Sequence, residues 1–308
     1  MSAEVLFSHR AKAEAASGIT GRRKCDTALA GILLFSREVN PIRIVFCTEN
    51  PDVRDLFARL VLHAAGAGKL SIKKEKRDPK PALYTMKITD PKALEAVYSR
   101  AGIDNFDGSS LGYFRDIPSR LFGAFAAGVF LSCGTVVEPR KGYHLEFVTQ
   151  NENICRELSE MFEERLEITG GVIKRRSKYV LYFKESEHIE DILTLIGAPH
   201  ASLELMNVKI YKDLRNHANR ATNCDTANLG KQNRSSQKQI EAIKAIKSAG
   251  IYERLSSGLK TAAELRLANP DMSLSELADN VNPPMSRSGL NHRLQRLIEI
   301  AEDIRNNV

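Results

Sequence analysis

The chain repeats one order of secondary-structure patterns, and this internal repeat constrains the fold more than any other feature. The first copy begins with the apolar segment CDTALAGILLFS over Cys25–Ser36, and the second begins with SRLFGAFAAGVFLS over Ser119–Ser132. In each copy an amphipathic helix with a 3.6-residue apolar stripe follows, with segments of alternating apolar and polar residues on either side of it. The duplication predicts two halves with the same fold.

The periodicity predicts the elements of both copies. After its apolar helix, the first copy is predicted to form a strand over Ile42–Asn50, a helix over Asp52–Gly66, alternating segments over 69–76 and 82–89, and a helix over Asp90–Ile103. The corresponding segments of the second copy are 135–139, Tyr143–Asn151, Glu152–Ile168, 171–177, 179–186 and Ser186–Ala198. Alternation suits sheets that face water on one side. We therefore predict an α+β fold in which the order αββαββα occurs twice.

An asparagine stands at the same point of each copy, where a strand ends and a helix begins. It is Asn50 in the tripeptide TEN and Asn151 in the tripeptide TQN. An Asn or Thr side chain at such a point can cap the helix by accepting hydrogen bonds from its first N–H groups. The shared tripeptide supports the alignment of the two copies.

The two apolar helices also share a pattern of two small or apolar residues followed by glycine, at Leu29–Gly31 and at Ala126–Gly128. A glycine inside a helix costs about 1 kcal/mol relative to alanine. Small residues allow two helix backbones to approach more closely than in ordinary helix packing. We therefore predict that Gly31 and Gly128 pack the two helices together as a seam between the halves.

Composition limits the classes of partner and site. The net charge of +7 favours an anionic partner such as nucleic acid, although an ordinary basic surface explains the charge equally well. The five cysteines form no C-x-x-C pair, which indicates a reducing, cytoplasmic location and neither a zinc site nor a disulfide framework. No apolar run approaches the roughly 20 residues of a membrane span. We expect no cofactor, no metal and no small-molecule substrate.

After residue 199 the pattern becomes helical and basic. The segment from Val208 to Lys247 contains nine basic and three acidic residues and is rich in asparagine. Lys, Arg and Asn side chains suit contacts with phosphates and base edges. The residues expected to contact DNA are Arg215, Asn216, Asn219, Arg220, Asn223 and Lys231. The alternative is a solvated linker helix between domains.

The last part of the chain predicts three short helices, over Gly258–Pro270, Ser273–Val281 and Ser286–Ile304, with a capping box at the start of the second and a turn at Asn282–Pro284. A helix, a short turn and a helix form a helix-turn-helix, in which the second helix enters the major groove by its N-terminal residues. The polar residues available there are Ser286, Arg287, Ser288, Asn291, His292, Arg293 and Arg296. Helical triplets also occur in proteins that bind no DNA.

The paired helices and their motifs resemble the LAGLIDADG homing-endonuclease fold. In that family the helices form a seam, each half lays a four-stranded saddle over DNA, and an acid at the eighth motif position holds Mg²⁺. Here the eighth positions are Ser36 and Cys133, and neither is a good Mg²⁺ ligand. Glu38 and Glu138 lie nearby and could substitute for the acids, but they are better explained as solvated glutamates at strand edges. The resemblance implies a retained fold and a lost catalytic centre.

The degenerate motif pair, the segment YKDLRNHANRATNCDTANLGK at Tyr211–Lys231 and the segment SRSGLNHRLQRL at Ser286–Leu297 together resemble the WhiA family of Gram-positive bacteria. The resemblance implies a regulator of cell division, chromosome segregation and, in sporulating relatives, transcription, associated with the nucleoid. The expected domains are an N-terminal helix or arm (1–21), two LAGLIDADG-like repeats (22–110 and 111–200), a basic helical linker (201–250) and a helix-turn-helix domain (251–308).

Three functions are compatible with these features. The first is a non-catalytic, sequence-specific regulator that binds double-stranded DNA. The second is an active Mg²⁺-dependent endonuclease, which would need acids that Ser36 and Cys133 do not supply. The third is an interaction scaffold, with a protein partner at the saddle and the C-terminal helices tethering it to DNA.

Overall fold

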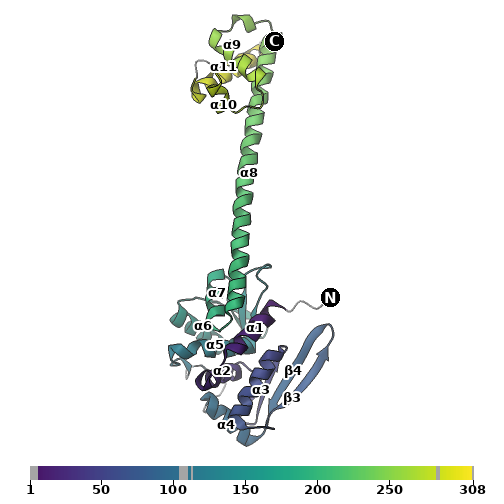
Figure 1. The fold of residues 1–308 in the computed structure, drawn as a ribbon, viewed down its shortest axis with the longest axis vertical. Helices are drawn as coiled ribbons and strands as arrows, with labels where there is room; N and C mark the ends of the chain where they lie inside the picture. The colour runs from purple at the N-terminus through teal and green to yellow at the C-terminus, as the bar shows by residue number, and fades with distance from the viewer. Residues whose placement is uncertain (1–5, 104–109, 112–113, 282–284, 307–308) are drawn as a thin grey trace. The chain divides into compact units, whose positions relative to one another are not determined.

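The computed structural model describes residues 6–103, 110–111, 114–281 and 285–306 (Figure 1). The chain divides into two compact units, Met1–Lys212 and Asp213–Val308, and each unit has its own hydrophobic core. The turn predicted at Asn282–Pro284 lies outside the described residues.

The N-terminal unit contains the predicted duplication. The first copy consists of α2 (Arg22–Leu34), β1 (Glu38–Asn40), β2 (Arg43–Thr48), α3 (Pro51–Ala65), β3 (Ser71–Arg77), β4 (Lys80–Ile88) and α4 (Pro91–Ala101). The second consists of α5 (Ser119–Cys133), β5 (Gly134–Val136), β6 (Leu145–Thr149), α6 (Glu152–Leu166), β7 (Gly171–Arg175), β8 (Lys178–Phe183) and α7 (Ser186–Leu195). Each copy forms an antiparallel four-stranded sheet, in the order β1-β2-β4-β3 or β5-β6-β8-β7. The predicted αββαββα order is confirmed in both copies.

The two copies also agree in register and capping. Thr48 pairs with Tyr84 in the first sheet, and Thr149 pairs with Tyr179 at the equivalent position of the second. Asn50 caps α3, where its Oδ1 accepts the N–H of the second helical residue at 2.8 Å. Asn151 caps α6 in the same way, also at 2.8 Å. Equivalent residues therefore occupy equivalent places in the two halves.

Helices α2 and α5 pack against each other through their glycines. A Cβ atom added at Gly31 would overlap the carbonyl oxygen of Phe125, and one added at Gly128 would overlap the carbonyl oxygen of Ala28. The obstacle is backbone in both cases, so a rotamer change could not relieve it. The residues of α2 from Ala28 to Leu34 and of α5 from Ala124 to Leu131 are buried on every side.

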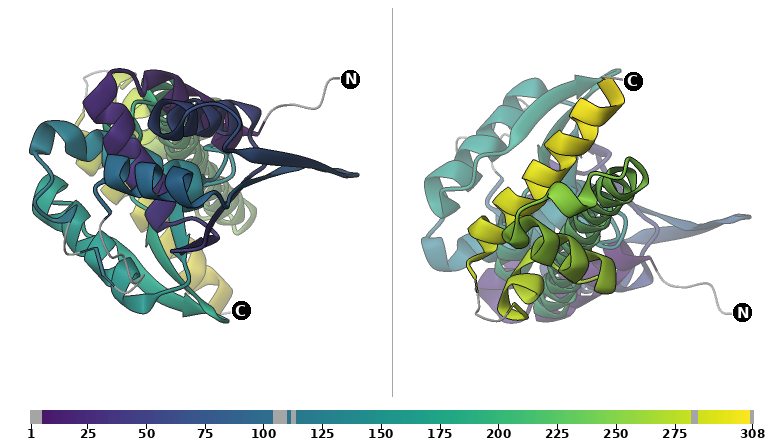
Figure 2. Two further views of the ribbon diagram at one scale, coloured as in Figure 1. Left: turned by 90° about the horizontal axis from the view of Figure 1, so that it is seen from below. Right: turned by 90° about the horizontal axis from the view of Figure 1, so that it is seen from above.

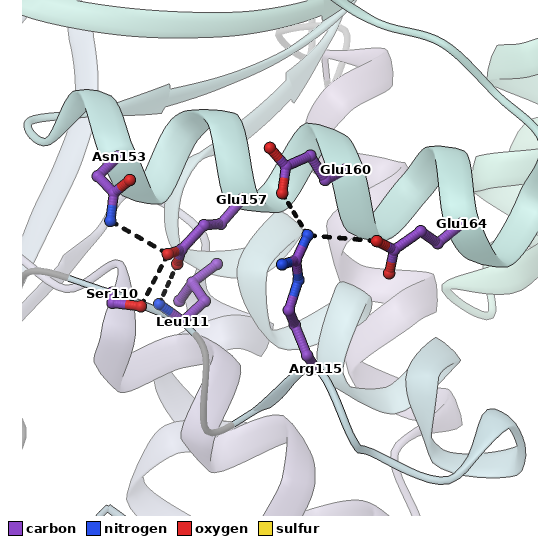
Figure 3. Close-up of polar contacts among 7 residues, drawn as sticks. All are labelled: Ser110, Leu111, Arg115, Asn153, Glu157, Glu160 and Glu164. Carbon is purple, nitrogen blue, oxygen red and sulfur yellow. Dashed lines mark hydrogen bonds and ion pairs between the residues drawn. The ribbon is translucent and has the colours of Figure 1, made fainter.

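The segment before α5 is fastened to α6 by a set of polar contacts (Figure 3). Glu157 on α6 accepts hydrogen bonds from the Ser110 hydroxyl at 2.7 Å and from the Leu111 N–H. Arg115 forms ion pairs with Glu160 and, at 3.2 Å, with Glu164. These contacts hold the segment that leads into α5 against α6, which belongs to the same copy of the repeat.

The N-terminal segment, expected as a helix or arm, contains a helix that packs into the N-terminal unit. Helix α1 (Phe7–Gly18) buries Phe7, Ala11, Ala15 and Ala16 in the core of the N-terminal unit. The Ala-rich composition of α1 suits this position, because small side chains allow the helix to lie close to α3 and α5. The Glu14 carboxylate also accepts the N–H groups of the first turn of helix α8 (Pro199–Ser248), at 2.7 and 3.1 Å.

The expected basic linker at 201–250 is not a separate part. Helix α8 is continuous, and the boundary between the two units falls inside it, after Lys212. Near its beginning Ala201 and Leu205 are buried in the N-terminal core, and near its end Ile243 and Ile246 are buried in the C-terminal core. Each end of the helix therefore contributes to the core of a different unit.

The rest of the C-terminal unit is helical, as predicted. It consists of the 3₁₀ turn η2 (Tyr252–Arg254) and helices α9 (Ser257–Ala268), α10 (Leu274–Asp279) and α11 (Arg287–Asn306). The predicted capping box is confirmed, because the Ser273 and Glu276 side chains each bond to the other's backbone N–H. The inward residues of α11 are Leu290, Leu294, Leu297 and Ala301.

Replacing Gly128 by alanine tests the seam. We expect Gly128→Ala to lower the free energy of unfolding by about 1–3 kcal/mol, because the new methyl group forces the two helix backbones apart. The measurement is urea denaturation followed by far-UV circular dichroism. Gly142→Ala is the matched control, since its Cβ would meet nothing within 4 Å. Equal stability of the two variants would contradict the close packing of α2 and α5.

Candidate nucleic-acid interface

Both degenerate motif positions lie at the end of the seam and line one cavity of about 490 Å³, which we call the seam cavity. Ser36 follows α2 and donates its hydroxyl hydrogen bond to the carbonyl oxygen of Ile32 at 2.7 Å. Cys133 is the last residue of α5, and burial raises the pKa of its thiol to about 12. The two motif positions therefore present a hydroxyl and a neutral thiol to the cavity, and neither residue has a carboxylate.

The two glutamates near these positions, Glu38 and Glu138, make different contacts. The Glu38 carboxylate also lines the seam cavity, but it is paired with Arg43 and accepts a hydrogen bond from Asn40 at 2.8 Å. The hydrogen bond from Arg43 lowers the pKa of Glu38. Glu138 does not line the cavity, and its carbonyl oxygen accepts the N–H groups of a tight turn. Across the described ranges, no group of three or more His, Cys, Asp and Glu side chains could hold a metal ion.

Two basic hairpins belong to the sheets, and the sequence analysis did not single them out. The β3–β4 hairpin extends away from the rest of the N-terminal unit (Figure 2), and its residues 71–80 include five basic and two acidic side chains. Its counterpart, the β7–β8 hairpin, has four basic residues and no acid over 171–178. The exposed basic residues of the two tips are Lys73, Lys74, Lys76, Lys80, Lys174, Arg175, Arg176 and Lys178. Basic residues recur at equivalent places in the two copies of the repeat, and this recurrence could have revealed the two hairpins from the sequence.

Arg176 at the second tip has an unusual backbone conformation. Its φ of 57° lies in the left-handed region, which side chains other than those of Gly, Asn and Asp rarely adopt. An arginine there costs about 1 kcal/mol relative to glycine. An exposed, positively charged residue at such a position is a candidate for function.

The candidate DNA-contacting residues of α8 are all exposed. Every residue from Asp213 to Leu229 is exposed, and so is Lys231. This stretch includes the candidates Arg215, Asn216, Asn219, Arg220 and Asn223. Lys212, immediately before it, packs over the Tyr143 ring at 4.5 Å and donates to the Pro139 carbonyl oxygen at 2.7 Å. Lys212 is thus held against the N-terminal unit, and the exposed stretch begins at the next residue.

Most of the candidate reading residues of α11 point to solvent. The exposed ones are Ser286, Arg287, Ser288, Asn291, His292 and Arg296. Ser286 also caps the helix by accepting the Gly289 N–H at 3.1 Å, and Arg296 is paired with Glu299 at 2.8 Å. Arg293 differs from the others because it is half-buried and its guanidinium lies close to Gly258 at the start of α9.

Two family models match this chain, one largely in each of its two units. A family model described as the WhiA LAGLIDADG-like domain matches residues 122–215, and one described as the WhiA C-terminal HTH domain matches residues 218–301. A probable cell division protein WhiA from Clostridium botulinum is 37% identical over 289 residues, which cover 91% of this chain and 90% of that protein. The chain belongs to the WhiA family. A further relative with this name, from Clostridium novyi, is 35% identical and covers 97% of this chain and 95% of its own.

Solved WhiA structures have the same fold. The full-length WhiA protein of Thermotoga maritima matches with a TM-score of 0.60 and 24% identity, covering 97% of this chain and 98% of that one. The separate N-terminal LAGLIDADG domain of a WhiA protein matches with a TM-score of 0.51 and 23% identity over 63% of this chain and 92% of its own. Among the described residues, no helix of this WhiA-family chain is long and apolar enough to cross a membrane.

Arg266 is a further residue that sequence reasoning missed in the WhiA HTH domain. It is only 2% exposed, and its Nη1 donates to the carbonyl oxygens of Asn269, Pro270 and Met272 at 3.2, 3.3 and 2.8 Å. Burial lowers the pKa of its guanidinium. Arg266 thus fixes the turn that leads from α9 into α10, the first helix of the helix-turn-helix. A lone arginine in a helix carries no sequence signal of this role.

Replacing Arg266 by methionine removes the hydrogen bonds that hold this turn. We expect Arg266→Met to destabilise the C-terminal unit by about 2 kcal/mol or more, because the carbonyl oxygens of Asn269 and Met272 lose the charged donor that holds the turn. Thermal melting measures the change. The control is Arg305→Met, which removes the same charge from an exposed site in the same unit. A melting temperature equal to that of the control would show that the turn does not need Arg266.

Proposed function

We propose that this WhiA-family protein is a non-catalytic regulator that binds double-stranded DNA in a sequence-specific manner. The observation that carries the proposal is the arrangement of α11. Its leucines Leu290, Leu294 and Leu297 are fully buried, while the polar residues near its N-terminus are exposed. This is the arrangement that a recognition helix needs, since it must be anchored on one face and present hydrogen-bonding groups on the other.

In this proposal α11 reads the bases. Arg287 and Asn291 lie on the exposed side of the helix, and these residue types recognise guanine and adenine edges in the major groove. Arg293 is better suited to a supporting role, because its guanidinium lies close to α9. The N-terminus of α11 also favours a nearby phosphate, because the helix dipole places its positive end there.

The remaining basic surfaces supply contacts that do not depend on sequence. The exposed stretch of α8 carries Arg215, Arg220 and Lys231 without any hydrophobic cover. The two hairpin tips add further positive charge on the N-terminal unit. Side chains of this kind bind phosphates and release counterions, so the affinity for DNA should fall steeply as salt increases. A protein partner at the sheets is compatible with these contacts.

The chemistry at the end of the seam supports binding without cleavage. Ser36 and Cys133 offer no carboxylate for Mg²⁺, and the Glu38 carboxylate is paired with Arg43. The cellular role that we propose is in cell division and chromosome segregation, at the nucleoid, with control of transcription in sporulating relatives. It is supported by the name that the clostridial relatives carry.

Arg287→Ala tests base reading by α11. We expect a loss of roughly tenfold or more in affinity for a native binding site found by genome-wide mapping, and a much smaller loss for scrambled DNA, because one good contact contributes about 1–3 kcal/mol of discrimination. Arg305→Ala is the matched control, with the same charge change at the other end of α11. Fluorescence anisotropy at fixed salt measures both affinities. An equal loss on both DNAs would assign Arg287 to the backbone and remove it from base reading.

Arg176→Gly tests the role of the β7–β8 tip. We expect the variant to be more stable to urea by up to about 1 kcal/mol, because glycine adopts the left-handed conformation without strain. We expect it also to bind scrambled DNA several-fold more weakly, with a shallower salt dependence. Arg176→Ala should lose the same affinity without the gain in stability. Unchanged DNA binding by both variants would rule out a contact at this tip.

A further inference from the structure

Helix α1 closes a second cavity, of about 430 Å³, which we call the α1 cavity. Ser8, His9 and Lys12 line it from the side of α1. The opposite walls come from the end of β2 and the turn before α3, and from Ser132 at the end of α5. All of these residues belong to the N-terminal unit, and none of them belongs to the surfaces proposed to bind DNA.

The duplication shows what is particular about the α1 cavity. The seam cavity is lined by Thr149, Gln150 and Asn151, and the α1 cavity by the equivalent residues of the first half, Thr48, Glu49 and Asn50. The two cavities are therefore related by the pseudo-two-fold symmetry of the unit. The polar groups of α1 line only the α1 cavity, and they change its chemistry.

Lys12 is a half-buried cation without a carboxylate partner. Its Nζ donates to the Leu131 carbonyl oxygen at 3.3 Å and lies 5.7 Å from the centre of the Phe130 ring. The nearest acid on the cavity wall, Glu49, is held by Arg77 at 2.6 Å. Among the described residues Lys12 forms no ion pair. An ammonium group that is partly withdrawn from water and lacks a counter-charge is costly, and an anion in the cavity would reduce that cost.

Hydroxyl groups add further donors to the same cavity. The buried Ser132 hydroxyl has no hydrogen-bond partner among the described residues. The Ser8 hydroxyl accepts the Val136 N–H at 3.3 Å and still has its own proton to donate. Buried polar groups are nearly always hydrogen-bonded, so an unpaired hydroxyl in a cavity beside an ammonium group indicates a missing acceptor.

We propose that the α1 cavity binds a small metabolite through a carboxylate or phosphate group, with the ammonium group of Lys12 as its counter-charge and the hydroxyls of Ser8 and Ser132 as hydrogen-bond donors. The cavity volume lies within the range of small-molecule sites. The proposal does not depend on the DNA-binding function. In this proposal α1 binds a ligand as well as packing in the core. Helix α1 also contacts the beginning of α8 through the ion pair of Arg10 with Glu204.

The charge state of Lys12 gives the binding a pH dependence. Burial lowers the pKa of Lys12 to about 8, while the Glu49 carboxylate acts in the opposite direction. His9 lies on the same cavity wall, and Cys133 nearby is a neutral thiol. A bound anion favours the protonated amine and raises this pKa. Affinity is therefore full below the pKa of the free protein and falls as the pH rises above about 8.

The test is NMR of the lysine side chains in the full-length protein, titrated with inorganic phosphate and with acetate, and with chloride at equal ionic strength. A saturable shift of the Lys12 signal with phosphate alone indicates a phosphate ligand, and one with acetate alone indicates a carboxylate. A pH series with sulfate, whose charge is constant, should raise the pKa of Lys12 by at least about one unit, equivalent to a tenfold preference for the protonated form.

Variants complete the test. Lys12→Met should weaken anion binding, measured by calorimetry, at least tenfold, whereas Lys24→Met, at an exposed site on α2, should leave it unchanged. A circular dichroism spectrum and melting curve show whether Lys12→Met still folds, and Ser132→Ala provides a milder variant with an expected loss of several-fold. No shift of Lys12 with either oxyanion, or a shift that chloride reproduces, would overturn the proposal.

Discussion

The close approach of α2 and α5 is the constraint on which the N-terminal unit depends. Two helices can meet at this distance only where side chains are absent, and Gly31 and Gly128 each face a backbone carbonyl of the other helix. The contact fixes the position of one half against the other, because each sheet follows directly from the end of its seam helix. One pair of glycines therefore sets the relative positions of the two sheets, their hairpins and the cavities at the end of the seam.

The same geometry separates the packing of the two helices from the chemistry at their ends. The ends of the two helices still meet at one cavity, but Ser36 bonds to its own helix and Cys133 remains a neutral thiol. Packing requires the glycines and the apolar residues around them, and it does not require the acids that follow. The packing of the seam therefore does not depend on which residues stand at Ser36 and Cys133.

Some features of the structure could be predicted because they are local. The alternation of the strands, the stripes of α3 and α6, the caps Asn50 and Asn151 and the capping box at Ser273 depend on residues close in sequence. Other features could not. The burial of Arg266 and the partial burial of Lys12 depend on surfaces contributed by distant segments. The conformation of Arg176 depends on a turn that usually contains glycine or asparagine. The half-buried position of Arg293 likewise depends on the packing of α11 against α9.

Periodicity and motif spacing record the duplicated order of elements, the two glycine-bearing helices, the residues Ser36 and Cys133 at the motif positions and the polar N-terminus of the last helix, so these features can be predicted from the sequence. The packed structure was needed to show that α1 belongs to the core, that α8 is one helix divided between two units, and that Lys12 lines a cavity without a carboxylate partner. The physical reason is that burial and charge pairing are properties of surfaces brought together from distant parts of the chain, and no local pattern of residues encodes them.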